Sequence, residues 1–245
     1  MAKQIWKAGN MLYPLPVVMV TVAGRDGRPN IITVAWTGTV CTNPPMLSIS
    51  VRPERYSYDL LRETREFAVN LTTEKLAYAT DYCGVRSGRD VDKFAVLGLT
   101  PEKAAHIGAP LIGESPVNIE CRVTERRACG SHDLFLAEVL CVHADEAYMD
   151  EKGRFDLAKA RPIVYDHGSY YGLGRALGRF GFSVKKPEEP PRSKGPSGSK
   201  TPSGKTAGAK QAGAKPTGAK PSRKSEKRAA RGKRPAGRTR PDIKA

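Results

Sequence analysis

Large apolar side chains are almost absent from the last quarter of this sequence. After Val184 the only one is Ile243, and the rest of the segment is mainly Lys, Arg, Gly, Ala, Pro and Ser. A segment of this composition cannot bury enough apolar surface to offset the entropy that ordering costs. We therefore expect a globular domain at residues 1–184 and a disordered, basic tail at residues 185–245.

Acidic residues are scarce in the same tail. Residues 185–245 hold 19 Lys and Arg against 4 Asp and Glu, so their net charge of +15 accounts for nearly all of the chain's +16. Lysines recur there at every fifth position from Lys200 to Lys220, a period that matches neither a helix nor a strand. Two readings stay open: the tail binds nucleic acid or another polyanion without sequence preference, or it is an inert, solubilising extension.

Close pairs of cysteines are missing as well. The five cysteines are an odd number and form no Cys-x-x-Cys pair, which makes a poor disulfide framework and favours a reducing compartment. The N-terminus has no apolar segment of signal-peptide length, and the apolar run Leu15–Ala23 is far shorter than the roughly 20 residues that span a bilayer. We therefore expect a soluble cytoplasmic protein that does not enter a membrane.

The alternation of strands and helices that a parallel sheet requires is also lacking. Two β-branched runs, Leu15–Ala23 and Ile31–Trp36, flank Asp26-Gly27 as in a hairpin. Further strand patterns cover residues 46–51, 66–71, 118–128, 132–149 and 161–174, and helical patterns cover residues 56–64 and 76–84, with a loop at residues 87–98 entering another helix. Six to eight strands with a few short helices predict a mainly β fold, a closed or partly closed barrel.

The spacing of the cysteines and histidines gives only a weak indication of a metal site. Cys121, Cys129, His132, Cys141 and His143 fall within a short span, but their only tight pairs are Cys129-x2-His132 and Cys141-x-His143. Zinc sites usually bring their ligands in closer cysteine pairs, and cysteines in alternating strands are more simply read as small buried residues. We predict no metal site.

One stretch has side chains that are unusually small for a strand. The residues VAWTGTVCTNPP are followed within about twenty positions by the basic segment RPERYS. A thin strand can lie against a flat flavin ring, while arginines, a hydroxyl and a helix start can bind a phosphate. The alternative is a strand with one polar face followed by solvated arginines.

The order of these segments resembles the flavin-reductase-like family of FMN-binding split β-barrels, and its flavoredoxin-like members in particular. The resemblance rests on the continuous segment at residues 14–71 and on DYCGVRSGRDVDKF, APLIGESPVNIECRV and CGSHDLFLAEVL further along. It covers roughly residues 8–175 and leaves the tail unmatched. The implied fold is a Greek-key split β-barrel that binds FMN and usually completes its flavin site across a homodimer.

The resemblance also implies cofactor-binding residues. The isoalloxazine ring would lie along Ala35, Trp36, Thr37, Gly38 and Thr39, and the wall would continue through Cys41, Thr42 and Asn43. The phosphate would be held by Arg52, Arg55, Ser57 and Tyr58, with Lys93 close to the same anion or to the nicotinamide cofactor.

Three further residues have open roles. His132 stands where related sequences often read Gly-Asp-His, so it is a candidate catalytic residue near the flavin face; Ser131 replaces the carboxylate that could orient it. The alternative is a strand-end histidine bonded to the backbone. Cys83 is read as packing near the cofactor, and Asn70 as either a site residue or a structural one.

The resemblance implies an FMN-containing flavin reductase or electron carrier. Electrons would pass from NADH or NADPH through FMN to free flavin, a small molecule or a partner protein. The competing class is a nucleic-acid-binding or polyanion-binding protein that acts through its basic tail, with the barrel as a scaffold.

Overall fold

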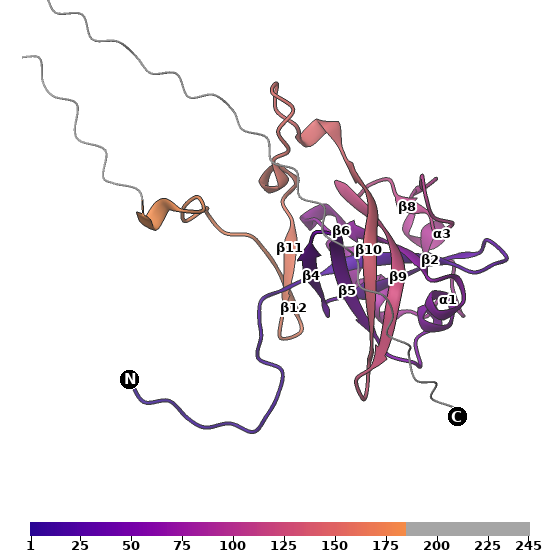
Figure 1. The fold of residues 1–245 in the computed structure, drawn as a ribbon, viewed down its shortest axis with the longest axis horizontal. Coiled ribbons are helices and arrows are strands. Elements are labelled where there is room, and N and C mark those ends of the chain that lie inside the picture. Colours follow the sequence, from indigo (N-terminus) through magenta and orange to yellow (C-terminus); the bar gives the residue numbers. More distant parts are fainter. Residues whose placement is uncertain (185–245) are drawn as a thin grey trace, which may run out of the picture. The chain divides into compact units, whose positions relative to one another are not determined.

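The chain is mainly β in the computed structural model, which describes residues 1–184 (Figure 1). The predictions made for residues 185–245 lie outside the described residues. The strands are β1 (Leu15–Pro16), β2 (Val18–Ala23), β3 (Pro29–Val34), β4 (Thr37–Thr42), β5 (Pro45–Val51), β6 (Glu66–Leu71), β7 (Pro101–Glu102), β8 (Leu111–Ile112), β9 (Val117–Ala128), β10 (Asp133–Ala144), β11 (Ile163–Asp166) and β12 (Ser169–Gly172). The helices are α1 (Tyr56–Thr64), α2 (Ala77–Val85) and α3 (Lys93–Leu97), with 3-10 turns at Glu74–Leu76, Glu146–Tyr148, Leu157–Ala160 and Phe182–Val184.

The described strands form three sheets. Seven strands pair in the order β3-β2-β6-β9-β10-β5-β4, three in the order β1-β11-β12, and β7 pairs with β8. Every pairing is antiparallel. The predicted mainly β class is confirmed, but twelve strands exceed the expected six to eight because several are only two to four residues long.

The two edges of the large sheet are joined by only two residues. β3 and β4 lie at opposite ends of the strand order, yet only Ala35 and Trp36 separate them in the chain. Such a link holds Val34 within about 11 Å of Thr37. The sheet must therefore curl until its edges meet, as a split barrel does, and the Trp36 carbonyl accepts a 2.8 Å hydrogen bond from the Ser50 backbone N–H at that seam.

The barrel interior explains the long apolar run that begins the domain. Val18, Val20 and Val22 point into a core shared by six of the seven strands and by α1. Met19, on the opposite face of β2, packs with Ile31 beneath α2 and α3. Because both faces of β2 are covered, its sequence is continuously apolar rather than alternating.

Most predicted elements are found within a residue or two of their expected bounds. α1 has the predicted bounds, and α2 begins one residue later than expected. The strand predicted at residues 132–149 ends at Ala144, because the Asp145 carboxylate accepts a hydrogen bond from the Ala147 backbone N–H and starts a 3-10 turn. No helix within residues 1–184 is long and apolar enough to cross a membrane.

A buried carboxylate ties a loop to the large sheet. Glu120 on β9 is fully buried, and its two oxygens accept hydrogen bonds of 2.7 Å each from the backbone N–H groups of Ala105 and His106. Burial alone would raise the pKa of Glu120, but the hydrogen bonds to its oxygens outweigh burial and hold that pKa below its ordinary 4.5. Glu120 is therefore an ionised group that the fold solvates with its own backbone.

Replacing Glu120 with Gln is expected to lower the free energy of unfolding by about 2 kcal/mol at pH 7, because one backbone N–H would then face an amide NH2 group. The folded pKa of Glu120 is depressed, so its contribution is fully present above about pH 4.5 and is lost as the pH falls through the lowered value. Denaturant unfolding measures both effects. Glu125→Gln, on an exposed position of β9, is the control; equal losses in the two variants would contradict the assignment.

Candidate functional site

Three adjoining cavities run along the seam of the barrel. The inner, central and outer cavities have volumes of about 160, 630 and 640 Å³. The inner and central cavities share Ile32, Arg55 and Gly84, and the central and outer cavities share residues that include Ala35 and Trp36. We call the three together the trough; it follows the line where β3 and β4 meet.

The inner cavity is basic and lies at the start of α1. Arg55, Arg86, Arg89 and Lys93 line it against a single carboxylate, that of Glu54. Within residues 1–184 no carboxylate lies at ion-pair distance from the guanidinium groups of Arg55 or Arg86. The guanidinium of Arg89 lies 5.4 Å from the Tyr56 ring centroid and donates to the Glu54 carbonyl.

The helix start in this cavity lacks a capping side chain. Arg55 is the N-cap residue of α1, and its side chain makes no capping hydrogen bond. The buried Ser57 hydroxyl accepts a 2.7 Å hydrogen bond from the Asn30 side chain, which fixes its position in the cavity wall. Free backbone N–H groups, the helix dipole and surplus positive charge are the features that favour an anion at this position.

Lys93 is a buried residue that lines the inner cavity. Its buried ammonium donates to the carbonyl oxygens of Ile31 at 2.6 Å and Cys83 at 2.9 Å, which leaves one of its three donors for the cavity. Burial is the main cause that lowers the pKa of Lys93. Burial raises the pKa of the neighbouring Cys83 thiol to about 11, so Cys83 is a packing residue of the cavity wall.

The central cavity has an aromatic wall. The rings of Trp36 and His132 are nearly parallel, at 9° and 5.9 Å between centroids. The Ser131 hydroxyl lies 3.0 Å from His132 Nδ1, so Ser131 can orient the imidazole. Tyr165 and Tyr170 line the same cavity from the small sheet, where the Tyr170 hydroxyl donates to Asp81.

Burial and two arginines disfavour the charged form of His132. Burial is the largest cause that lowers the pKa of His132 below 6.5, and the positive charges of Arg52 and Arg55 lower it further against the opposing charge of Glu54. Arg52 lines the central cavity and lies 3.5 Å from a Glu54 carboxylate oxygen. At pH 7 the imidazole can therefore donate or accept a hydrogen bond without carrying charge.

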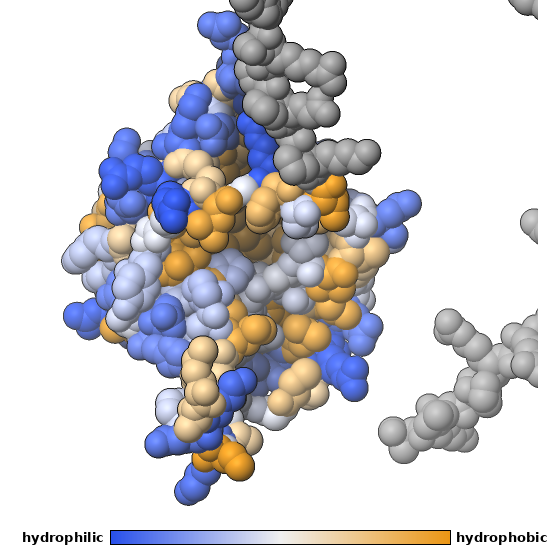
Figure 2. All heavy atoms as spheres, turned by 90° about the vertical axis from the view of Figure 1, so that its left-hand side faces the viewer, coloured by the Kyte–Doolittle hydropathy of each residue, from blue (hydrophilic) through white to orange (hydrophobic). Residues whose placement is uncertain are grey.

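The outer cavity lies over the thin part of β4. Thr37, Gly38 and Thr39 line it together with residues 9–13 of the N-terminal segment. A methyl group built on Gly38 would meet nothing within 4 Å, so the protein itself leaves open space there. Figure 2 shows the face of the molecule that carries β4, β11 and β12, with apolar side chains around a central hollow.

Not every predicted site residue is brought to the trough. Cys41 and Thr42 lie at the far end of β4 and Asn43 directly follows it, and none of the three lines a cavity. The Tyr58 side chain is buried, and its hydroxyl donates to Asp133 at 2.6 Å instead of facing the inner cavity. Asn70 is a structural residue, because its fully buried amide bonds to Met19, Ile112 and Asn118.

The remaining predicted residues do line the trough, but not all where they were expected. Arg52 belongs to the central rather than the inner cavity. The segment between α2 and α3 was missed as a site, although its sequence, Arg-Ser-Gly-Arg at residues 86–89, has two arginines around a small, tightly packed turn. A methyl group on Gly88 would lie 2.1 Å from an Asn30 oxygen, so this turn requires glycine.

Comparisons with known proteins identify the family and support the fold. The family described as "Flavin reductase like domain" matches residues 10–174. The structure of flavoredoxin from Desulfovibrio vulgaris superposes with a TM-score of 0.70 at 32% identity, covering 75% of this chain and all of that one. The flavoredoxin of Methanosarcina acetivorans gives 0.67 at 29% identity, with the same 75% and 100% coverage.

Two further relatives extend the set. The FMN-binding protein of Thermus thermophilus, in its structure with bound 1-cyclohex-2-enone, has a TM-score of 0.62 at 25% identity and covers 73% of this chain and 99% of that one. An uncharacterized protein of Aeropyrum pernix is 34% identical over 63% of this chain and 58% of its own length. The chain thus spans little more than half of that relative.

The pKa of His132 is expected to lie below 6.5 and to rise in Arg52→Gln, because one of the positive charges that disfavour the imidazolium is then removed. NMR titration of the imidazole C–H signals measures it, and His132→Gln assigns the signal among the four histidines. Arg25→Gln, whose guanidinium pairs with Glu63 instead, should leave the value unchanged. A wild-type pKa above 6.5 would contradict the described environment.

Proposed function

This chain belongs to the flavin reductase like domain family, and on that premise we propose that it is an FMN-binding oxidoreductase, a flavin reductase or a flavoredoxin-like electron carrier. Electrons pass from NADH or NADPH through FMN to free flavin, a small molecule or a partner protein. The observation that carries the proposal is the trough, which has an anion site at one end and a thin, open strand at the other.

The inner cavity fits the phosphate of FMN. Arg55, Arg86 and Arg89 supply charge-assisted donors, and the uncapped start of α1 supplies backbone N–H groups. Ser57 adds a hydroxyl that Asn30 holds in place. A divalent anion would neutralise most of the surplus positive charge in this cavity.

The central and outer cavities fit the isoalloxazine ring. Ala35 and Trp36 line both cavities, and the small residues of β4 continue the same wall. The open space beside Gly38 has no explanation within the protein and suits a flat ligand. Main-chain groups of an extended segment can bond the ring's polar edge.

The chemistry that FMN supplies when bound is the acceptance of a hydride and its release as one or two electrons. The residues of the chain bind the flavin, orient it and shield it from water. Neutral His132, held beside Trp36 and by Ser131, is placed to bond a nicotinamide or the polar edge of the ring. Tyr165 and Tyr170 add two further aromatic rings to the lining of the central cavity.

The purified protein is expected to bind one FMN per chain, and the bound flavin should bleach when NADH or NADPH is added without oxygen. Flavin fluorescence and visible absorbance measure the two steps. A chain that carries no flavin absorbance after incubation with excess FMN and removal of the unbound flavin by gel filtration would contradict the oxidoreductase proposal.

Arg55→Ala and Arg89→Ala should each weaken FMN binding by about 10- to 100-fold, which corresponds to the loss of one hydrogen bond to a charged group. Riboflavin, which lacks the phosphate, should lose little affinity in the same variants. Arg25→Ala, on an exposed turn that does not line the inner cavity, is the matched control. Equal losses for FMN and riboflavin would place the phosphate elsewhere.

A homodimer is the second part of the proposal. Large apolar side chains are exposed in both terminal segments of the described domain, namely Ile5, Trp6, Met11, Leu12, Leu173, Leu177, Phe180 and Phe182. The first of these segments borders the outer cavity through residues 9–13. A second copy of the chain that covers these side chains would also close the outer cavity over the ring.

Sedimentation velocity is expected to give a dimer at micromolar concentration. Trp6→Ser combined with Leu12→Ser should shift the protein toward monomer, because the covered apolar area is lost, and should weaken FMN binding at the same time. Val96→Ser removes an exposed apolar side chain from α3 and should leave the dimer intact. A monomeric wild-type protein would contradict this part of the proposal.

A further inference from the structure

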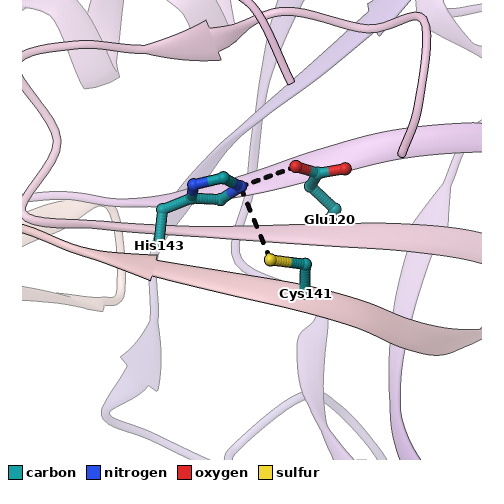
Figure 3. A group of neighbouring side chains, drawn as sticks. All are labelled: Glu120, Cys141 and His143. Atoms are coloured by element: carbon teal, nitrogen blue, oxygen red, sulfur yellow. Dashed lines mark hydrogen bonds and ion pairs between the residues drawn. The ribbon is translucent and has the colours of Figure 1, made fainter. Parts of the chain in front are cut away.

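A second group of chemically active side chains lies outside the trough. Figure 3 shows Glu120 on β9 facing Cys141 and His143 on β10. One ligand atom from each of the three residues lies within 4.8 Å of the other two. None of the three lines a trough cavity.

A β-bulge brings these side chains to one face. Val139 pairs with Cys121 and Cys141 pairs with Glu120, so two steps along β10 match one step along β9. Cys121 belongs to the barrel core and Val139 packs against it, whereas Glu120 bonds the loop on the opposite face of the sheet. In a regular strand without the bulge, Cys141 would lie two residues after Val139 and therefore on the same, core-facing side. The bulge therefore re-aims Cys141 and His143 toward Glu120.

The contacts have the pattern of a chelate rather than of a proton relay. His143 Nε2 lies 2.6 Å from Glu120 Oε1 and 3.7 Å from Cys141 Sγ. In a relay of the kind that activates a nucleophile, the acid and the nucleophile contact opposite ring nitrogens. Here the oxygen and the sulfur converge on the same nitrogen.

The carboxylate is already oriented for a ligand. Glu120 accepts backbone N–H groups on both oxygens, and each carboxylate oxygen has a second lone pair. Hydrogen bonds of this kind hold the ligands of metal sites in place. Glu120 is fully buried, so the site is built into the sheet and is not a chance meeting of surface chains.

We propose that Glu120, Cys141 and His143 bind one zinc ion through oxygen, sulfur and nitrogen, with a fourth position open to solvent on the half-exposed side of His143. Zinc bond lengths place sulfur and nitrogen ligands about 3.6 Å apart in a tetrahedron, which the present pair nearly matches. His143 Nε2 and Glu120 Oε1, which lie 2.6 Å apart, would have to move apart by less than about 1 Å to reach the distance between two zinc ligands. A carboxylate, a thiolate and a neutral imidazole balance the charge of Zn²⁺.

Binding requires a defined proton movement. The Cys141 thiol releases its proton to solvent, and the imidazole proton of His143 moves from Nε2 to Nδ1 so that Nε2 can bind the metal. Affinity therefore falls as the pH is lowered. The ion would join β9 to β10. Because its ligand Glu120 also accepts hydrogen bonds from Ala105 and His106, the ion would stabilise the attachment of that loop to the sheet.

The sequence prediction of no metal site lacked the third ligand. It considered Cys141 and His143 together with Cys121, Cys129 and His132, which the fold places elsewhere. Glu120 was not considered, because a lone glutamate about twenty residues earlier in the sequence has no spacing typical of a metal ligand. Cys129 and His132 lie at the other end of the β9–β10 hairpin and line the trough.

Metal-free full-length protein is titrated with Co²⁺ and then Zn²⁺. The expected result is one Co²⁺ per chain with thiolate-to-cobalt absorbance in the near ultraviolet, displaced by one Zn²⁺. Cys141→Ala should abolish the absorbance, and both Cys141→Ala and His143→Ala should weaken Zn²⁺ by about 100-fold or more. All five cysteines and all four histidines belong to the described residues, so competing ligands are few.

Cys129→Ala and His106→Ala are the matched controls, since each removes an exposed side chain of the same type. Both should keep wild-type zinc affinity. Wild-type protein without the thiolate band, or Cys141→Ala with wild-type affinity, would overturn the proposal. FMN affinity, measured on Cys141→Ala and His143→Ala, reports folding independently, because neither residue lines the trough.

Discussion

The two-residue link from β3 to β4 is the constraint on which the rest of the structure depends. Ala35 and Trp36 connect the opposite edges of a seven-stranded sheet, so the sheet can exist only as a curled layer whose edges meet at this point. The edges meet without pairing, and the side chains that flank the link face a gap. The trough is therefore a direct result of how the barrel closes.

The basic side chains of the site gather at one end of the trough. Residues 1–184 together are nearly neutral, yet the inner cavity is lined by four basic side chains near the uncapped start of α1. Unpaired cations held close together cost free energy through mutual repulsion, and an anionic ligand relieves that cost. Burial is the largest cause that disfavours protonation of His132, and the positive charges of Arg52 and Arg55 add to it.

Local sequence patterns predicted the helices and strands well, because the formation of these elements depends mainly on residues that are close together in the sequence. The bounds of α1 and the β2–β3 hairpin follow from short-range spacing and from the turn at Gly27, which has a positive φ of 77°. The site depends on long-range contacts and was predicted in part. Tyr58 follows Ser57 in the chain, yet the helix turns its side chain toward Asp133, and only the fold brings Arg86 and Arg89 to Ser57. The bulge at β10 likewise cannot be read from the spacing of Cys141 and His143.

A crystal structure of the protein with FMN tests the central claim most directly. The account predicts the phosphate at the start of α1, bonded to Ser57, Arg55 and Arg89, and the ring along Ala35–Thr39 beside Trp36 and His132. A phosphate bound away from the inner cavity, or a ring at the far end of β4 beside Cys41 and Asn43, would contradict it.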